Sequence, residues 1–190
     1  MGEKGNNTRK LIREQAYHLF AAKGFAGVTM KDICEACDLS RGGLYRHYGS
    51  TRQIFEEILG VMSAKDDDFI RNGIKEGFSP TEMLTVILSG LRTEMLDSTN
   101  SLCYAIYEYS RLCSSEFMEV LNVKAKDKWR LLLEYGKKCG EFHHKNTDQM
   151  IDTILYVYQG IQMWNQIISM DEKTIDNIVN KIESDLKGGN

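Results

Sequence analysis

Apolar residues recur three and four positions apart along nearly the whole chain, which is the pattern of amphipathic helices. The alternation of β-branched and polar residues that would indicate strands is absent, and the only proline is Pro80. The pattern therefore predicts an all-α fold, preceded by a frayed tail over residues 1–7. Helices are expected at about 8–23, 30–36, 41–47, 51–75, 80–97, 101–112, 115–138, 147–169 and 172–187.

Local signals fix several of these helix ends. Gly24 is expected to end the first helix as a C-cap. Ser50 with Gln53, and Ser79 with Glu82, have the spacing of capping boxes and predict the starts of the fourth and fifth helices. Because the long fourth helix follows the third almost directly, we expect the N-terminal part to continue rigidly into the rest of the chain.

The segment from residue 29 to residue 50 predicts two short helices joined by a tight turn. Thr29 and Ser40 are the expected N-caps, and Leu44 is expected to be buried. Two adjacent glycines in the second helix cost roughly 1 kcal/mol each relative to alanine, which is tolerable where another backbone must come close. A helix with so few bulky side chains suits insertion into a DNA major groove. Its expected outer face consists of Ser40, Arg41, Gly42, Gly43, Tyr45 and His47.

Charge is distributed unevenly. Residues 1–52 hold nine Lys/Arg and five Asp/Glu, a net charge of +4, whereas the remaining residues carry −7 of the total of −3. A basic head on an acidic body fits a module that binds phosphates. No run of about eighteen apolar residues suggests a membrane span, and the polar N-terminus does not read as a signal peptide. Five cysteines make an odd number, so we expect a reducing cytoplasm.

The segment from Thr8 to Phe55 resembles the DNA-binding domain of TetR/AcrR-family transcriptional regulators. The matching pieces are AYHLFAAKGFAGVTM (16–30), DICEACDLS (32–40) and RGGLYRHYGS (41–50). The resemblance implies a helix-turn-helix domain over residues 1–50 and a helical ligand-binding and dimerisation domain over residues 51–190. It implies that Arg41 reads a guanine edge and that Thr29 contacts a phosphate. The DNA-binding residues it implies are Thr29, Ser40, Arg41, Gly42, Gly43, Tyr45, His47, Thr51 and Arg52.

The sequence departs from the family pattern in three places. The turn reads Cys-Asp-Leu at residues 37–39 instead of Ala-Gly-Val, so Asp38 must take the left-handed conformation that glycine would supply. Gly43 stands where a hydroxyl or alanine is common. Thr51 stands where the family commonly has lysine, and Arg52 is the candidate substitute for its phosphate contact.

Tyrosine, tryptophan and methionine are frequent in the C-terminal part. Most of these side chains are expected in the core, but a helical body of this composition also suits a cavity for an apolar or aromatic effector with a few polar anchors. Gln162 and Asn165 are further candidate anchors. The residues predicted to line the cavity are Met62, Met95, Tyr104, Tyr107, Glu108, Trp129, Gln159 and Met163.

The segment 147–169 is apolar nearly all round, so both of its sides must be covered. One side meets the chain's own core, and the other predicts a partner, with Gly160 allowing close approach. Together with the last helix this predicts half of a four-helix homodimer interface. The predicted dimerisation residues are Ile154, Val157, Gly160, Ile161, Trp164, Ile168, Ile175, Ile178, Val179 and Ile182.

Motifs for other chemistry are weak. Cys34-x2-Cys37 lacks the second ligand pair that zinc needs, and Asp66-Asp67-Asp68 reads as a solvated face. His143 and His144, four and five residues after Cys139, read as solvated loop histidines. No phosphate loop, metal quartet or nucleophile–base pair supports an enzyme, and no metal or cofactor is expected.

The sequence thus predicts a cytoplasmic, homodimeric, effector-responsive repressor that binds a double-stranded DNA operator. Two alternatives stay open. One is a DNA-binding activator or architectural protein without a ligand. The other is a sensor that works through its thiols, which are Cys34, Cys37, Cys103, Cys113 and Cys139.

Overall fold

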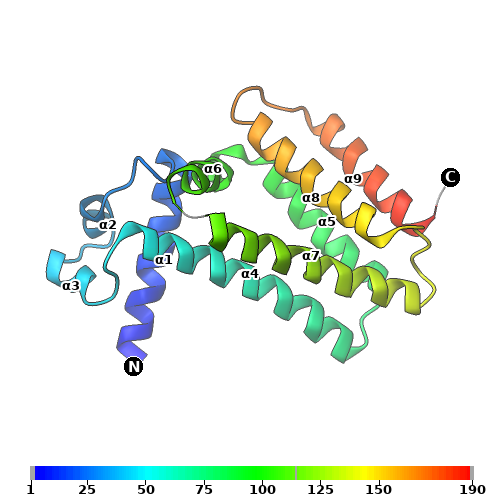
Figure 1. Cartoon of the computed structure of the whole chain (residues 1–190), viewed down its shortest axis with the longest axis horizontal. Helices are drawn as coiled ribbons and strands as arrows, with labels where there is room; N and C mark the ends of the chain where they lie inside the picture. The colour runs from blue at the N-terminus through cyan, green and yellow to red at the C-terminus, as the bar shows by residue number, and fades with distance from the viewer. Residues whose placement is uncertain (1–2, 114, 189–190) are drawn as a thin grey trace. The chain divides into compact units, whose positions relative to one another are not determined.

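The computed structural model describes residues 3–113 and 115–188, and every regular element in these residues is helical (Figure 1). The chain divides into two compact units, one made of residues up to Met62 with Thr99–Met118, the other of Ser63–Ser98 with the residues from Glu119 on. The elements are α1 (Glu3–Lys23), α2 (Met30–Ala36), α3 (Arg41–Tyr45), α4 (Thr51–Glu76), α5 (Pro80–Leu96), the 3-10 turn η1 (Ser98–Asn100), α6 (Cys103–Leu112), α7 (Ser115–Lys138), α8 (Thr147–Trp164) and α9 (Glu172–Lys187).

The division into units runs through α4, which is one continuous helix belonging to both. The first unit also includes α6, so it is a larger set of residues than the predicted DNA-binding segment 1–50. This grouping describes packing alone. A functional division at residue 50 remains a prediction.

The predicted helix boundaries agree with the structure to within two residues, except at the start of the first helix and at the end of the predicted helix 147–169. The first helix already begins at Glu3, so residues 3–7 continue the helix and do not form the predicted tail; the first two residues of that tail lie outside the described residues. The third helix ends at Tyr45, since the N–H groups of residues 47 and 48 both turn back to the Leu44 carbonyl. The predicted helix 147–169 ends at Trp164.

The early end of α8 has a visible cause in Asn165. Its Nδ2 donates to the Met95 carbonyl at 2.6 Å, and its Oδ1 accepts from the Met170 N–H at 2.8 Å. Both polar groups of this buried amide are thereby satisfied, and the chain leaves the helix at this point. Asn165 therefore has a structural role, and its role as an effector anchor stays a prediction.

Aromatic side chains form the centre of the first unit. The ring centroids of Phe20 and Phe55 lie 4.8 Å apart, and Tyr109 of α6 lies 5.1 Å from Phe25 and 5.3 Å from Phe55. Tyr109 is fully buried, and its hydroxyl donates to Glu56 at 2.5 Å. Burial, followed by this hydrogen bond, raises the pKa of Tyr109 to about 12.

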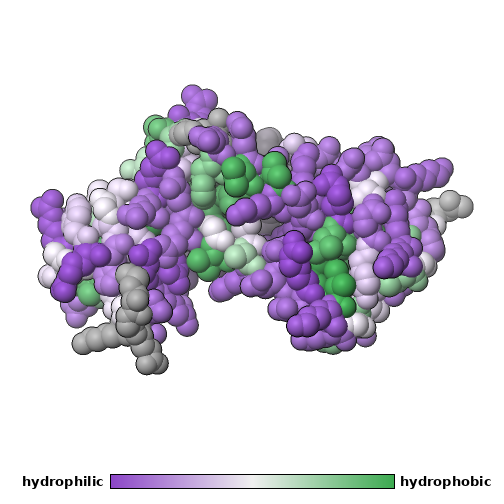
Figure 2. Space-filling view, turned by 60° about the horizontal axis from the view of Figure 1, so that its bottom comes forward, coloured by the Kyte–Doolittle hydropathy of each residue, from purple (hydrophilic) through white to green (hydrophobic). Residues whose placement is uncertain are grey.

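The second unit is built around α5, on which both α8 and α9 pack (Figure 1). Its core is aliphatic, with one tryptophan and one phenylalanine. Polar residues cover most of the face drawn in Figure 2, where hydrophobic side chains form separate green patches. The fully or nearly buried core side chains include Ile70, Met83, Leu84, Leu88, Met95, Trp129, Leu132, Leu133, Phe142, Ile151, Ile154, Ile175 and Leu186.

The buried stripe of α8 corrects part of the dimer prediction. Residues 151, 154, 155, 161 and 162 are all buried, since positions three and four apart share one helix face. Ile154 and Ile161 therefore meet the chain's own core and do not face a partner. Three predicted dimer residues of α9 are buried in the same core, and these are Ile175, Val179 and Ile182.

The opposite face of α8 is exposed. Trp164 is 50% exposed and Ile168, just beyond the helix, is 57% exposed; Gly160 lies at the surface and Val157 is half-buried. Ile178 of α9 is half-buried, but its exposed neighbours on that helix are polar. The candidate partner surface is thus narrower than predicted and lies on the outer side of α8.

His144 corrects another expectation, because this loop histidine is buried (7% exposed) whereas His143 is exposed. Its Nε2 lies 3.2 Å from Thr147 Oγ1, an atom that also accepts from Lys137 Nζ and donates to Glu134. Burial, and next the Lys137 charge, lower the pKa of His144 below its usual 6.5.

This lowered pKa predicts an acid-sensitive contribution to stability. Just below pH 6.5 the imidazole of His144 is protonated in the unfolded chain but stays neutral in the folded chain. The free energy of unfolding therefore falls as the pH drops from about 7 to about 5. His144→Gln should reduce this fall, as measured by urea unfolding across that range. His143→Gln is the matched control and should leave it unchanged; equal effects of the two variants would contradict the assignment.

Candidate nucleic-acid interface

Thr29 and Asp32 form the predicted cap of α2. The Thr29 hydroxyl accepts from the Asp32 N–H at 3.2 Å, and the Asp32 carboxylate accepts from the Thr29 N–H at 2.8 Å. Hydrogen bonds from Thr29, then from Lys23, hold the pKa of Asp32 well below its usual range. The same carboxylate also accepts from the Thr29 hydroxyl, so both donors of Thr29 are used within the cap, and the predicted phosphate contact would have to replace one of these hydrogen bonds.

The turn between α2 and α3 adopts the geometry expected from its unusual sequence. Asp38 has φ 51°, making it the one non-glycine residue with positive φ among the described residues. The left-handed conformation is tolerated by Asp at some cost. Ile33 and Cys37 are buried on one side of the turn, and burial raises the pKa of the Cys37 thiol.

Helix α3 begins at a cap and buries one side chain. The Ser40 hydroxyl accepts from the Gly43 N–H at 3.1 Å, and Leu44 is completely buried. Arg41 and Tyr45 are exposed, and the Arg41 guanidinium carbon lies 5.5 Å from the centre of the Tyr45 ring. The predicted outer face of this helix is therefore turned to solvent over its first turn.

The two glycines of α3 differ in their surroundings. A Cβ added at Gly42 would meet no atom within 4 Å, whereas one at Gly43 would lie 3.2 Å from Ser40 Oγ. A Cβ at Gly43 would thus be tightly placed against the Ser40 cap, whereas the fold gives no reason for Gly42. Close approach of an external partner is a reason that remains.

A groove of about 460 Å³ lies between α2 and α3. It opens on the same surface as the start of α3, and several of its residues are polar or charged. Its lining residues are Thr29, Met30, Lys31, Cys34, Arg41 and Tyr45.

The remaining predicted DNA contacts are less open. His47 is half-buried, and its buried Nδ1 has no hydrogen-bond partner within the described part of the chain. Thr51 is half-buried, while Arg52 is exposed and its Nε donates to Glu56 at 2.7 Å. Because Glu56 also accepts from Tyr109, Arg52 is held at a defined position on the first turn of α4.

Sequence reasoning missed a cluster of polar residues behind α3. Glu57 of α4 accepts hydrogen bonds from Arg9, Arg13 and Tyr48, of which Tyr48 is 1% exposed. Burial alone would raise the pKa of Glu57, but the hydrogen bonds from Arg9, Tyr48 and Arg13 together have a larger effect. The pKa of Glu57 therefore lies below its ordinary value. The partners are far apart in sequence, so no local motif could have revealed the cluster.

The eight predicted effector residues are divided between the two units. Met62, Tyr104, Tyr107 and Glu108 belong to the first unit, and Glu108 accepts from the Ala26 N–H at 3.1 Å. In the second unit, Met95 and Trp129 are buried in the core, Gln159 is exposed, and Met163 is half-buried. Their role as effector contacts remains a prediction.

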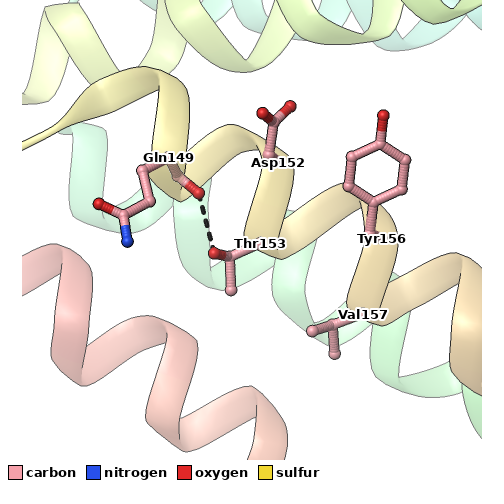
Figure 3. A pocket seen from close by; sticks show the side chains of 5 residues that line it. All are labelled: Gln149, Asp152, Thr153, Tyr156 and Val157. Atoms are coloured by element: carbon pink, nitrogen blue, oxygen red, sulfur yellow. Dashed lines mark hydrogen bonds between the residues drawn. The ribbon is translucent and has the colours of Figure 1, made fainter.

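A second groove, of about 690 Å³, lies on the exposed face of α8 (Figure 3). In the close-up, Asp152 and Tyr156 point to one side of the helix and Thr153 and Val157 to the other. All the lining residues, which include Gln149, come from α8. Apart from Val157, which was predicted to contact a partner chain, none of them was a predicted site residue.

Other motifs from the sequence have ordinary partners. Asp66 pairs with Lys128 and Asp67 with Arg71. Within the residues described, no cluster of three or more His, Cys, Asp or Glu side chains could hold a metal ion. None of the helices seen in those residues combines the length and hydropathy needed to cross a bilayer.

Comparison with known proteins places this geometry in a family. Residues 12–58 match the profile of bacterial regulatory proteins of the tetR family. The HTH-type transcriptional repressor KstR2 of Rhodococcus jostii is 31% identical over 149 residues, which is 74% of this chain and 70% of the relative. The chain belongs to the TetR family of helix-turn-helix transcriptional regulators.

Solved structures agree on the fold. Salmonella enterica GusR superposes with a TM-score of 0.73 at 20% identity, covering 96% of this chain and 95% of that one. AibR, whose structure is a complex with isovaleryl coenzyme A and operator DNA, superposes with a TM-score of 0.66 at 17% identity, covering 95% and 98%.

The unexplained glycine of α3 gives the first prediction for DNA binding. Gly42→Ala should stabilise the free protein by about 1 kcal/mol, because alanine favours the helix and the space is open. The same methyl should weaken DNA binding by blocking close approach of the helix. Thermal unfolding and fluorescence anisotropy measure the two effects. A variant that is more stable and binds DNA as tightly as the wild type would contradict the role of this face.

The second prediction separates base reading from phosphate contact. Arg41→Ala should weaken binding to a specific duplex more than to a random one, because a guanine contact carries sequence information. Thr29→Ala should weaken both by similar factors, and should also destabilise α2 by about 1 kcal/mol through loss of its cap. Equal losses on both duplexes for Arg41→Ala would exclude the base-reading role.

Proposed function

We propose that the protein is a homodimeric repressor in the cytoplasm that releases a palindromic operator when a small apolar or aromatic effector binds the C-terminal domain. The observation that carries the proposal is the outer face of α3, where a capped helix start presents Arg41 beside a glycine that the fold does not require. The basic N-terminal segment supports the same role through attraction to phosphates.

A dimer follows from the size of the reading helix. One helix of five residues offers too few base contacts for specificity, whereas two helices related by a dyad read two half-sites. The exposed face of α8 is the candidate partner surface, because Gly160 permits close approach and Trp164 is half exposed. Large apolar side chains at such a surface favour a buried interface.

Two observations support an effector. The Oε1 atom of Gln162 is buried and has no partner within the described residues, although its Nε2 lies 3.3 Å from the Tyr158 hydroxyl. An unpaired buried carbonyl costs about 1–3 kcal/mol, and a ligand with a hydrogen-bond donor would remove this cost. The name of the AibR structure, which includes both a coenzyme A ester and operator DNA, supports an effector in this family. The name of KstR2 supports repression.

A thiol sensor is the second candidate, and Cys34 is the observation that favours it. This half-buried residue lines the α2–α3 groove together with Arg41. An adduct on its sulfur would stand on the proposed DNA-binding face. If an oxidant releases the wild-type protein from DNA but does not release the Cys34→Ser variant, the result would favour a thiol sensor over a bound effector.

The proposal is tested first by selection of duplexes from a random library with the wild-type protein. We expect a palindromic consensus, a dimer by light scattering, and an affinity that falls steeply with salt. A monomer, or selection without enrichment of any sequence, would refute the proposal.

The effector is tested by a thermal-shift screen of apolar and aromatic molecules, followed by titration of each hit on operator-bound protein. Allosteric coupling of the usual size predicts operator affinity about 5- to 150-fold weaker. A hit that raises the unfolding temperature but leaves operator affinity unchanged would contradict the switch. A hit that strengthens operator binding would contradict release of the operator by the effector.

A further inference from the structure

One carboxylate lies at the junction of three chain segments in the first unit. Glu57 Oε1 accepts from Arg13 Nη1 at 2.6 Å and from the Tyr48 hydroxyl at 2.9 Å, while Oε2 accepts from Arg9 Nη2. The side chains of Arg9, Arg13 and Glu57 are each only about a quarter exposed. Two arginines of α1 and one tyrosine beyond α3 thus converge on a single side chain of α4.

These contacts continue to the C-terminal end of α3. Arg9 lies 4.5 Å from the centre of the Tyr48 ring and donates to the carbonyl of His47 at 3.4 Å. The N–H groups of His47 and Tyr48 both donate to the Leu44 carbonyl, at 2.9 and 3.1 Å. The position of Tyr48 therefore fixes the C-terminal end of α3, of which Leu44 is the buried residue.

We propose that Glu57 is a positioning residue for DNA reading, which holds the end of α3 at the orientation that base contacts require. The inference rests on the proposed function. Glu57 points at α1 and at the segment after α3, so it acts through Tyr48 and Arg9 and makes no contact with DNA itself. Hydrogen bonds to bases need a precisely oriented helix, whereas contacts to phosphates tolerate a looser one.

Charge gives the proposal a distinctive consequence. Glu57→Gln removes the negative charge that two guanidinium groups share and replaces one of the two acceptor oxygens with an NH2 donor, but it keeps the shape of the side chain and raises the net charge by one. The loosened end of α3 should weaken operator binding, while attraction to random DNA should persist, because it depends on total positive charge. A variant that merely unfolds would lose binding to the operator and to random DNA together.

The experiment compares affinities for the selected duplex and for a random duplex of equal length by fluorescence anisotropy. For Glu57→Gln we expect operator binding about tenfold weaker or more, the effect of a lost charge-assisted hydrogen bond. Random-duplex binding should stay within about twofold of wild type. Glu76→Gln, the same substitution at the exposed end of α4, is the matched control and should change the affinity ratio little.

A second variant covers the case in which Glu57→Gln does not fold, as judged by circular dichroism. Tyr48→Phe removes only the hydroxyl, and it should lower the ratio of operator to random affinity by about threefold. The proposal is overturned if the folded variants keep the wild-type ratio, or if Glu57→Gln weakens both duplexes equally. A wild type that does not distinguish the two duplexes would instead refute the proposed function.

Discussion

The proposed DNA-binding face of α3 depends on the burial of Leu44 and Tyr48, which stabilises a helix too short to be stable alone. Five residues form barely more than one turn, and isolated helices of this length do not persist in water. Burial of each large side chain contributes about 1.5–3 kcal/mol, and both are almost completely buried. Everything that α3 presents to a partner, including Arg41 and Gly42, is held in place by this anchoring from behind.

The anchoring has a polar layer as well as an apolar one. Tyr48 contributes its ring to the core and its hydroxyl to Glu57, while Tyr109 does the same with Glu56. These neighbouring carboxylates of α4 therefore bind different parts of the first unit. Glu57 contacts the segment after α3, and Glu56 contacts α6. Because α4 continues into the second unit as an unbroken helix, we propose it as the element through which an effector would act on α3.

Sequence patterns were reliable where the information is local. The caps at Thr29, Ser40 and Ser79 and the left-handed Asp38 are confirmed, since each depends on residues at most three positions away. The patterns were insufficient where distant segments meet. No spacing in the sequence brings Glu57 to Arg9, or shows that α8 buries Ile154 and Ile161 within the chain. The same limit applies to the predicted effector site, whose residues would depend on packing between helices.

The central claim is that the outer face of α3 meets base edges, once per protomer, in a two-fold complex. A crystal structure of the protein with its selected duplex tests this most directly. The account predicts that the two α3 helices lie in successive turns of the major groove on one side of the duplex, about 34–36 Å apart. Arg41 should contact a base edge, and Gly42 should lie against the DNA. A complex in which α3 lies away from the duplex, or in which only phosphates are contacted, would contradict it.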